Sequence, residues 1–160
     1  MVNRKPKHYD AVIDLPFGRV AICTVDGGLA QLLPVSTATV LKAPTTGLAQ
    51  RVCDELMAYV RDPCHRFSLP LAVRGTPFQQ KVWRSLTSIA PGVPVTYGAI
   101  ASRLKTSPRA VGGACRRNPV PIIVPCHRVV SVAGDGGYMG QTDGAAIRLK
   151  RWLLQHEARQ

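Results

Sequence analysis

The sequence lacks both a membrane span and an export signal. No run of about 18 apolar residues, the length that crosses a bilayer, occurs in it. The basic start, Met1 to Lys7, has none of the apolar core of a signal peptide. The five cysteines are an odd number and form no paired framework. We therefore expect a protein without disulfides, not bound to a membrane, in the reducing cytoplasm.

A zinc cluster is not expected either. The first half of the chain contains Cys23, Cys53, Cys64 and His65, but their spacing matches no CxxC-type zinc pattern. We expect no metal ligands here.

Acidic residues are scarce in the second half. Residues 1–74 carry nine Lys and Arg against six Asp and Glu, whereas residues 75–160 carry twelve against three. Six basic side chains and no acid lie between Arg103 and Arg128. Such a stretch suits a polyanion such as the phosphate backbone of a nucleic acid, or is simply a solvated basic face. Charge alone leaves both interpretations open.

The first half reads as strands followed by a helix. Three β-rich runs, 9–13, 20–25 and 29–33, are separated by turn residues, and predict an antiparallel meander. Apolar residues recur at helical spacing from about Gly47 and stop before Asp62-Pro63. The apolar stretch 67–73 predicts a further strand that closes the sheet.

The second half reads as helices with clear start signals. Thr76 and Gln79 form a capping box around Pro77, and one face of this helix is apolar at Phe78, Val82, Leu86 and Ile89. Thr96 begins a short helix to about Leu104. Ser107-Pro108 begins another, which should stop at Asn118-Pro119. Helix, three-residue turn and helix are the outline of a helix-turn-helix.

This last helix is unusually slim. Ala110, Gly112 and Gly113 lie in its middle, and each glycine costs a helix interior roughly 0.5 to 1 kcal/mol relative to alanine. Either tight packing inside the protein or close approach to a DNA backbone would explain such a composition.

The most informative residues are Pro125-Cys126-His127, which place a thiol beside an imidazole just after the apolar run from Val120 to Val124. Cysteine reacts as the thiolate, and a nearby base or positive charge is the usual means of forming it near neutral pH. Because adjacent strand residues face opposite sides, His127 can act on Cys126 only if the chain turns here or a water bridges them. A buried Cys that merely packs is the alternative.

Four segments in order carry a family resemblance. Arg109-Ala-Val-Gly-Gly-Ala-Cys-Arg-Arg-Asn-Pro-Val-Pro-Ile-Ile-Val-Pro-Cys-His-Arg-Val-Val130 resembles the O6-alkylguanine-DNA alkyltransferases. The resemblance extends to Gly75-Thr-Pro-Phe-Gln-Gln-Lys-Val-Trp83, Pro94-Val-Thr-Tyr-Gly-Ala-Ile-Ala101 and Lys150-Arg-Trp-Leu-Leu-Gln-His-Glu157. It covers about the last 85 residues of the chain.

The resemblance implies a fold of two domains. Residues 1–74 would form an α/β scaffold, a small antiparallel sheet plus helix of the ribonuclease H-like kind. Residues 75–160 would form a mostly helical, winged helix-turn-helix domain that binds DNA and accepts the alkyl group.

The resemblance also implies the reaction. A flipped O6-alkylguanine, and also O4-alkylthymine, in double-stranded DNA would give its alkyl group irreversibly to the cysteine, a direct reversal of damage with one turnover per molecule. No cofactor is implied, and we expect a monomer, nucleoid-associated in a bacterium or archaeon and nuclear in a eukaryote.

Site residues follow by matching positions. Cys126 matches the acceptor, His127 the imidazole that acts through water, Glu157 the carboxylate that holds it, and Asn118 the link between the helix and the active-site segment. Arg109 matches the arginine that replaces the flipped nucleotide, and Tyr97 the tyrosine that helps to rotate it. The implied DNA contacts also include Ala110, Gly112, Gly113, Arg116 and Arg128, and the implied pocket residues are Val129, Tyr138 and Met139.

Two departures concern the pocket. The segment 139–146 is longer and bulkier than the family usually has, and its glycines predict a mobile backbone with Met139 at the rim. Cys115 adds a second thiol near the DNA-facing surface, with packing as its expected role.

Three other classes of protein remain alternatives. A regulator that only binds DNA would need neither Cys126 nor Glu157, and alkyltransferase-like lesion sensors lack this cysteine. A cysteine hydrolase would need a distant histidine and an oxyanion hole, for which the layout offers no partner.

Overall fold

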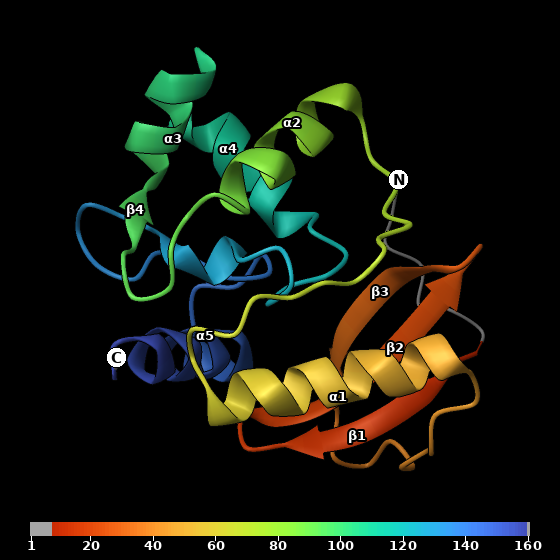
Figure 1. Ribbon diagram of the computed structural model, residues 1–160. Coiled ribbons are helices and arrows are strands. Elements are labelled where there is room, and N and C mark those ends of the chain that lie inside the picture. The colour runs from red at the N-terminus through yellow and green to blue at the C-terminus, as the bar shows by residue number, and fades with distance from the viewer. Residues whose placement is uncertain (1–7, 160) are drawn as a thin grey trace. The chain divides into compact units, whose positions relative to one another are not determined.

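The protein, described here by a computed structural model, folds as two compact units with the division between Arg74 and Gly75. The structure describes residues 8–159 (Figure 1). Within residues 8–159, every helix is too short or too polar to cross a bilayer.

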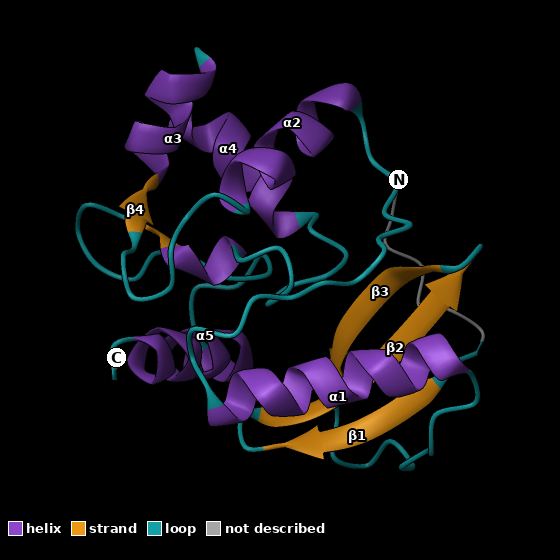
Figure 2. Cartoon of the chain, in the orientation of Figure 1, coloured by secondary structure: helices purple, strands orange, loops and turns teal. Residues whose placement is uncertain are grey.

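The N-terminal unit is a three-stranded antiparallel sheet with one helix. Strands β1 (Ala11–Leu15), β2 (Gly18–Val25) and β3 (Gly28–Val35) lie in the order β1-β2-β3 (Figure 2). Asp26 and Gly27 turn the chain from β2 to β3 with φ values of 50° and 75°, the left-handed region that short polar residues and glycine enter most readily. The predicted meander is therefore confirmed.

Helix α1 (Gly47–Arg61) covers this sheet. The Thr46 hydroxyl accepts a hydrogen bond from the Ala49 amide and so caps the first turn. Val52, Leu56 and Tyr59 are buried at helical spacing, and they supply the core of the unit. Both the start of this helix and its end before Asp62 agree with the sequence pattern.

The strand predicted for residues 67–73 is wrong. This segment meets the sheet at a single bridge between Leu29 and Leu71, with hydrogen bonds from the Leu29 amide to the Pro70 carbonyl and from the Ala72 amide to the Leu29 carbonyl. Because Pro70 has no amide hydrogen to donate, it interrupts any longer ladder.

The C-terminal unit is mostly helical. Its helices are α2 (Pro77–Leu86), α3 (Tyr97–Leu104), α4 (Pro108–Arg116) and α5 (Gly144–Glu157). A turn of 3-10 helix, η1 (Cys126–Arg128), precedes β5 (Val129–Val130), which pairs in parallel with β4 (Val95–Thr96). This short pairing, absent from the sequence-based prediction, connects the start of α3 to the segment that carries Cys126.

The predicted helix starts in this unit are confirmed, and two details differ. The capping box of Thr76 and Gln79 is present, and Thr96 and Ser107 cap α3 and α4. Phe78, however, is exposed, and Trp83 takes its place in the core, where its indole Nε1 donates to the Ala114 carbonyl at 2.9 Å. Helix α4 ends at Arg116, two residues before Asn118.

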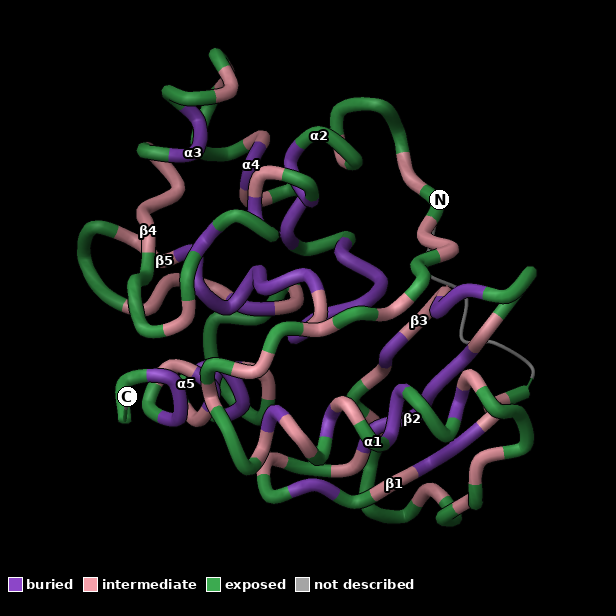
Figure 3. The backbone as a smooth tube through the Cα atoms, in the orientation of Figure 1, coloured by how far each residue is buried: buried purple, intermediate pink, exposed green. Residues whose placement is uncertain are grey.

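The most deeply buried stretch of this unit runs from Asn118 to Val129. Every residue in it is buried except Ile123, which is partly exposed (Figure 3). Ile122 has φ of 76°, an unfavourable conformation for a β-branched residue. The chain therefore enters the active-site turn along a path fixed by its surroundings.

Gly28 offers a test of the N-terminal core. A Cβ at Gly28 would lie 2.7 Å from the Ala72 amide nitrogen and 3.0 Å from the Leu71 carbonyl carbon, so Gly28→Ala must displace backbone. We expect the free energy of unfolding to fall by about 1 to 3 kcal/mol, the usual cost of overpacking. The measurement is the midpoint of urea unfolding followed by circular dichroism.

The matched control is Gly47→Ala, because a Cβ at Gly47 meets no atom within 4 Å. This change should leave the midpoint unchanged or raise it. Equal midpoints for the two variants would show that the 71–72 segment gives way without cost.

Candidate active site

Cys126 lies at the wall of a cavity of about 560 Å³ within the C-terminal unit. The thiol follows Pro125 at the first position of η1, and the residue is only 4% exposed. Residues from α3, α4 and the loop before α5 complete the wall, among them Tyr97, Cys115, Arg116, Tyr138 and Met139. The volume falls in the range of sites that hold a small organic molecule.

The Cys126 sulfur is a protonated thiol at neutral pH. Burial raises its pKa, and the hydrogen bonds from Asn118 and Tyr138 and the charge of Lys150 oppose this effect without overcoming it. The sequence led us to expect an activated sulfur, but the resting thiol is not ionised. A base must therefore remove its proton when the substrate is present.

Asn118 connects α4 to the active-site turn. Its Nδ2 donates to the Val124 carbonyl at 2.8 Å and to the Cys126 sulfur at 3.2 Å, while its Oδ1 accepts from the Val120 amide at 3.1 Å. The sequence analysis matched Asn118 only to a link between the helix and the active-site segment, and it did not predict the contact with the sulfur. A donor at this place stabilises the sulfur more as its negative charge grows.

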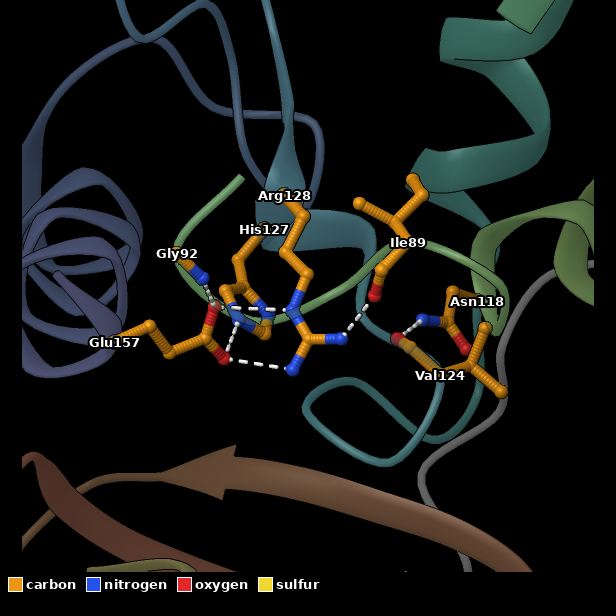
Figure 4. A network of polar contacts seen from close by, with 7 residues as sticks. All are labelled: Ile89, Gly92, Asn118, Val124, His127, Arg128 and Glu157. Atoms are coloured by element: carbon orange, nitrogen blue, oxygen red, sulfur yellow. Dashed lines mark hydrogen bonds and ion pairs between the residues drawn. The ribbon is translucent and has the colours of Figure 1, made fainter. Parts of the chain in front are cut away.

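His127 and Glu157 form a fully buried pair. His127 Nε2 lies 2.8 Å from Glu157 Oε1, and both side chains are 0% exposed (Figure 4). The chain turns at Cys126–Arg128 as a 3-10 helix, which removes the strand geometry that would have set adjacent side chains on opposite faces. Among residues 8–159, His127 Nδ1 has no hydrogen-bond partner.

The ionisation states of this pair are set by their neighbours. Burial alone would raise the pKa of Glu157, but hydrogen bonds from His127 and Arg128, together with their charges, lower it to about 2. Burial lowers the pKa of His127, against the raising effect of Glu157. Glu157 is thus a carboxylate, and His127 is a neutral imidazole whose Nε2–H donates to it. Nδ1 is left as the basic nitrogen.

The prediction that Arg128 contacts DNA is wrong. Its side chain is buried, with Nε donating to Glu157 Oε2 and Nη2 to Glu157 Oε1, both at 2.9 Å, and Nη1 donating to the Ile89 carbonyl at 2.5 Å. A buried carboxylate demands a cation close by, and this demand outweighs contact with solvent or phosphate.

The other α4 residues that the resemblance assigned to DNA contact are exposed or partly exposed. Arg109, Gly113 and Arg116 are exposed, and Ala110 and Gly112 are partly exposed. A Cβ at Gly113 would meet no atom within 4 Å, so packing inside the protein does not require glycine there. This finding removes the packing explanation for Gly113 and leaves close approach of a ligand.

Tyr97 and Tyr138 stand on the cavity wall. The Tyr97 hydroxyl donates to the Gly137 carbonyl at 3.3 Å, and burial raises the pKa of this phenol to about 12, so it remains a donor. Val129, in contrast, does not line the cavity: it is 0% exposed, its carbonyl accepts from Lys150, and Val130 takes the place predicted for it.

Met139 lies in a tight turn rather than in a loose loop. Tyr138 and Gln141 exchange two backbone hydrogen bonds of 2.8 and 2.9 Å, and Met139 and Gly140 between them have φ of 51° and 78°. A Cβ on Gly140 would lie 2.5 Å from Arg116 Nε, so the turn packs against α4. These bonds hold Met139 at the cavity.

Lys150 is a site residue that the sequence reasoning missed. It is 0% exposed, and its Nζ donates to the carbonyls of Val129 and Gly137 at 2.7 and 3.0 Å. The cation lies 5.8 Å from the centroid of the Tyr97 ring. Its signal was in the sequence, because Lys150 falls on the apolar stripe of α5 with Ile147 and Leu153, where a charge is seldom found.

Residues 8–159 contain no group of three or more His, Cys, Asp or Glu side chains arranged to hold a metal.

Cys115 is buried beside the cavity, and burial, with the negative charge of an ionised Cys126, raises its pKa to about 12. It is therefore a poor nucleophile.

Known proteins share this sequence and fold. A family model for the DNA-binding domain of 6-O-methylguanine DNA methyltransferase matches residues 77–159. A methylated-DNA--protein-cysteine methyltransferase of Thermococcus gammatolerans is 52% identical over 83 residues, 51% of this chain and 45% of that protein. The chain thus spans less than half the length of that relative.

Two further relatives are matched over more of their length. The Mycobacterium tuberculosis methylated-DNA--protein-cysteine methyltransferase is 41% identical over 117 residues, 71% of this chain and 68% of that protein. A crystal structure of the M. tuberculosis O6-methylguanine methyltransferase superposes with a TM-score of 0.79 at 33% identity, over 94% of this chain and 92% of the other.

A structure of M. tuberculosis OGT in complex with DNA gives a TM-score of 0.76 at 34% identity, over 92% of this chain and 91% of the other. The matches cover the segment that carries Cys126, His127 and Glu157 and, in the solved structures, nearly the whole chain. The chain therefore belongs to the methylated-DNA--protein-cysteine methyltransferase family.

Proposed function

We propose that this protein repairs DNA by transferring the alkyl group of O6-alkylguanine, and also of O4-alkylthymine, to Cys126. The observation that carries the proposal is a buried thiol at the wall of a cavity, with a neutral histidine held behind it by a carboxylate. The names of the relatives point to the same chemistry.

The proton of Cys126 leaves first. His127, neutral and fixed through Nε2, accepts this proton at Nδ1 through a bridging water, because the two side chains share no direct hydrogen bond. Asn118 and Lys150 stabilise the thiolate as it forms.

The thiolate then attacks the alkyl carbon in line. A sulfur–carbon bond forms while the carbon–O6 bond breaks, and the bonding pair leaves with guanine. The guanine takes up a proton in place of the one that Cys126 lost, so it leaves as its neutral tautomer and His127 returns to the neutral form. A thioether is not reversed by any group in the site, so each molecule acts once.

Entry of the base requires a flipped nucleotide, because O6 inside a duplex cannot reach a buried sulfur. Helices α3 and α4, joined by a three-residue turn, serve as the DNA-binding part of a winged helix-turn-helix, and the slim face of α4 enters the minor groove. Arg109 fills the gap left by the base, and Tyr97 crowds the phosphate of the rotated nucleotide. Residues 1–74 act as a scaffold.

We propose further that the protein works as a monomer in the cytoplasm, or in the nucleus of a eukaryote, without a cofactor. The basic surface of residues 75–160 supplies affinity for duplex DNA without sequence preference.

The acceptor is tested by mass spectrometry of the whole protein after reaction with duplex DNA that contains O6-methylguanine. The wild-type protein should gain one methyl group, and Cys126→Ser should gain none while still binding the duplex, because binding depends on the basic surface.

Cys115→Ser is the matched control, since Cys115 also borders the cavity. It should accept the methyl group as the wild-type protein does. A methyl group mapped to Cys115 in the wild-type protein would overturn the assignment of Cys126.

Arg109→Ala tests extrusion of the base. Loss of this side chain should slow repair of paired O6-methylguanine by at least about tenfold, because flipping costs a few kcal/mol that an intercalating side chain offsets. Reaction with free O6-benzylguanine, which needs no extrusion, should keep its rate. Arg103→Ala, a change to another basic residue of this unit, is the control for loss of charge.

Met139→Ala tests the shape of the cavity. Because the Tyr138–Gln141 turn holds Met139 at the wall, we expect methyl transfer to be efficient, benzyl transfer poor, and the benzyl rate to rise selectively in this variant. Met57→Ala, on α1 in the other unit, is the control. An unchanged ratio of methyl to benzyl rates would show that Met139 does not limit the size of the adduct.

A further inference from the structure

The three hydrogen bonds that Arg128 donates all have acceptors inside the protein. Two parallel hydrogen bonds of 2.9 Å join its Nε and Nη2 to the two oxygens of Glu157, and Nη1 donates to the carbonyl of Ile89 (Figure 4). This forked geometry fixes a carboxylate in plane as well as in position, which a lysine cannot do.

The Glu157 carboxylate accepts hydrogen bonds from two segments that are distant in the chain, η1 and the loop after α2. Oε1 accepts from His127 Nε2 at 2.8 Å and from Arg128 Nη2, and Oε2 accepts from Arg128 Nε and from the Gly92 amide at 3.4 Å. Arg128 and the loop after α2 are therefore attached to the same carboxylate that orients the imidazole.

We propose that Arg128 is a positioning residue for alkyl transfer: it holds Glu157 in the orientation and charge state that keep His127 fixed and neutral. This inference rests on the proposed function, because it concerns the same proton transfer. It gives Arg128, which the sequence pattern assigned to the DNA surface, a role in the reaction instead.

The charges around His127 explain why Arg128 matters. Glu157 of α5 contributes one negative charge, and Arg128 of η1 and Lys150 of α5 contribute positive charges that disfavour a protonated imidazole. The loop after α2 contributes only neutral backbone groups to this cluster, the Ile89 carbonyl and the Gly92 amide. Without Arg128, the buried carboxylate would draw a proton onto His127, and an imidazolium cannot take the thiol proton.

A purely structural ion pair is the alternative. In that case, loss of Arg128 would lower stability and the amount of folded protein, yet the folded fraction would transfer the methyl group with the same dependence on pH. The rate measured on folded protein and its pH profile therefore separate the two roles.

The experiment measures single-turnover methyl transfer from pH 5.5 to 9 for five full-length proteins: wild type, Arg128→Met, Arg128→Lys, Glu157→Gln and the double variant Arg128→Met/Glu157→Gln. Binding to undamaged duplex and the unfolding midpoint are recorded for each. Transfer by the wild-type protein is the control for the proposed function, since a wild-type protein that gains no methyl group refutes that function itself.

For Arg128→Met we expect transfer to slow by roughly 10- to 100-fold at pH 7, part of the ~10²- to 10⁴-fold that a positioned base contributes. The pH below which its transfer rate falls should rise by roughly 1 unit or more, because a carboxylate without the Arg128 charge beside it raises the pKa of His127. Arg128→Lys keeps the positive charge but cannot form the two parallel hydrogen bonds to Glu157. It should therefore retain the wild-type dependence of the rate on pH, with a reduced rate.

The double variant decides whether Arg128 acts through Glu157. With the carboxylate gone, Arg128→Met should cost nothing more, so the double variant should react no more slowly than Glu157→Gln and should show no rise in the pH below which its transfer rate falls. If Arg128→Met alone does not fold, this comparison still stands, because the double variant leaves no unpaired buried charge.

Three results would overturn the proposal while leaving the proposed function intact. In the first, folded Arg128→Met transfers the methyl group at the wild-type rate. In the second, the double variant is slower than Glu157→Gln by the full factor that Arg128→Met alone causes. In the third, the only effect of Arg128→Met is weaker binding to undamaged duplex. The last result would restore the role in DNA contact.

Discussion

The candidate active site depends on one buried negative charge, the carboxylate of Glu157. Glu157 is 0% exposed, and such a charge is tolerated inside a protein only when donors surround it. Its donors come from His127, Arg128 and the loop after α2. Because the buried anion needs these hydrogen bonds, Gly92 lies beside Glu157, about 65 residues away in the chain. The orientation of the imidazole is a consequence of this arrangement.

The same burial determines how the thiol behaves. Removal of Cys126 from water raises its pKa, which leaves an unreactive thiol in the resting protein. Asn118 and Lys150 are placed to stabilise the anion once it forms. In the proposed function Cys126 accepts one alkyl group only. A thiol that stays protonated at rest suits that function, because a permanently ionised sulfur would react with other electrophiles.

Local signals in the sequence predicted most of the elements. Caps at Thr76, Thr96 and Ser107 marked the helix starts, since a side-chain oxygen there satisfies amides that the helix leaves unpaired. The strand predicted for residues 67–73 was wrong because apolar character does not identify a partner strand, and Pro70 interrupts the hydrogen bonds to β3. The predicted burial of Phe78 was wrong because burial on α2 depends on which helix lies opposite. Trp83 is the residue of α2 that contacts α4.

For the site, the order of Pro125-Cys126-His127 and Glu157 in the sequence was enough to predict the segment that carries the thiol and the family of the chain. The basic, slim character of α4 could also be read from its residues. Which charges are buried together depends on the folded arrangement. The resemblance assigned Arg128 to the DNA surface, and the sequence analysis gave Lys150 no role. Both side chains are directed inward, since the carboxylate of Glu157 requires one and the carbonyls of Val129 and Gly137 bind the other. Such pairings join residues distant in the chain, and no local pattern encodes them.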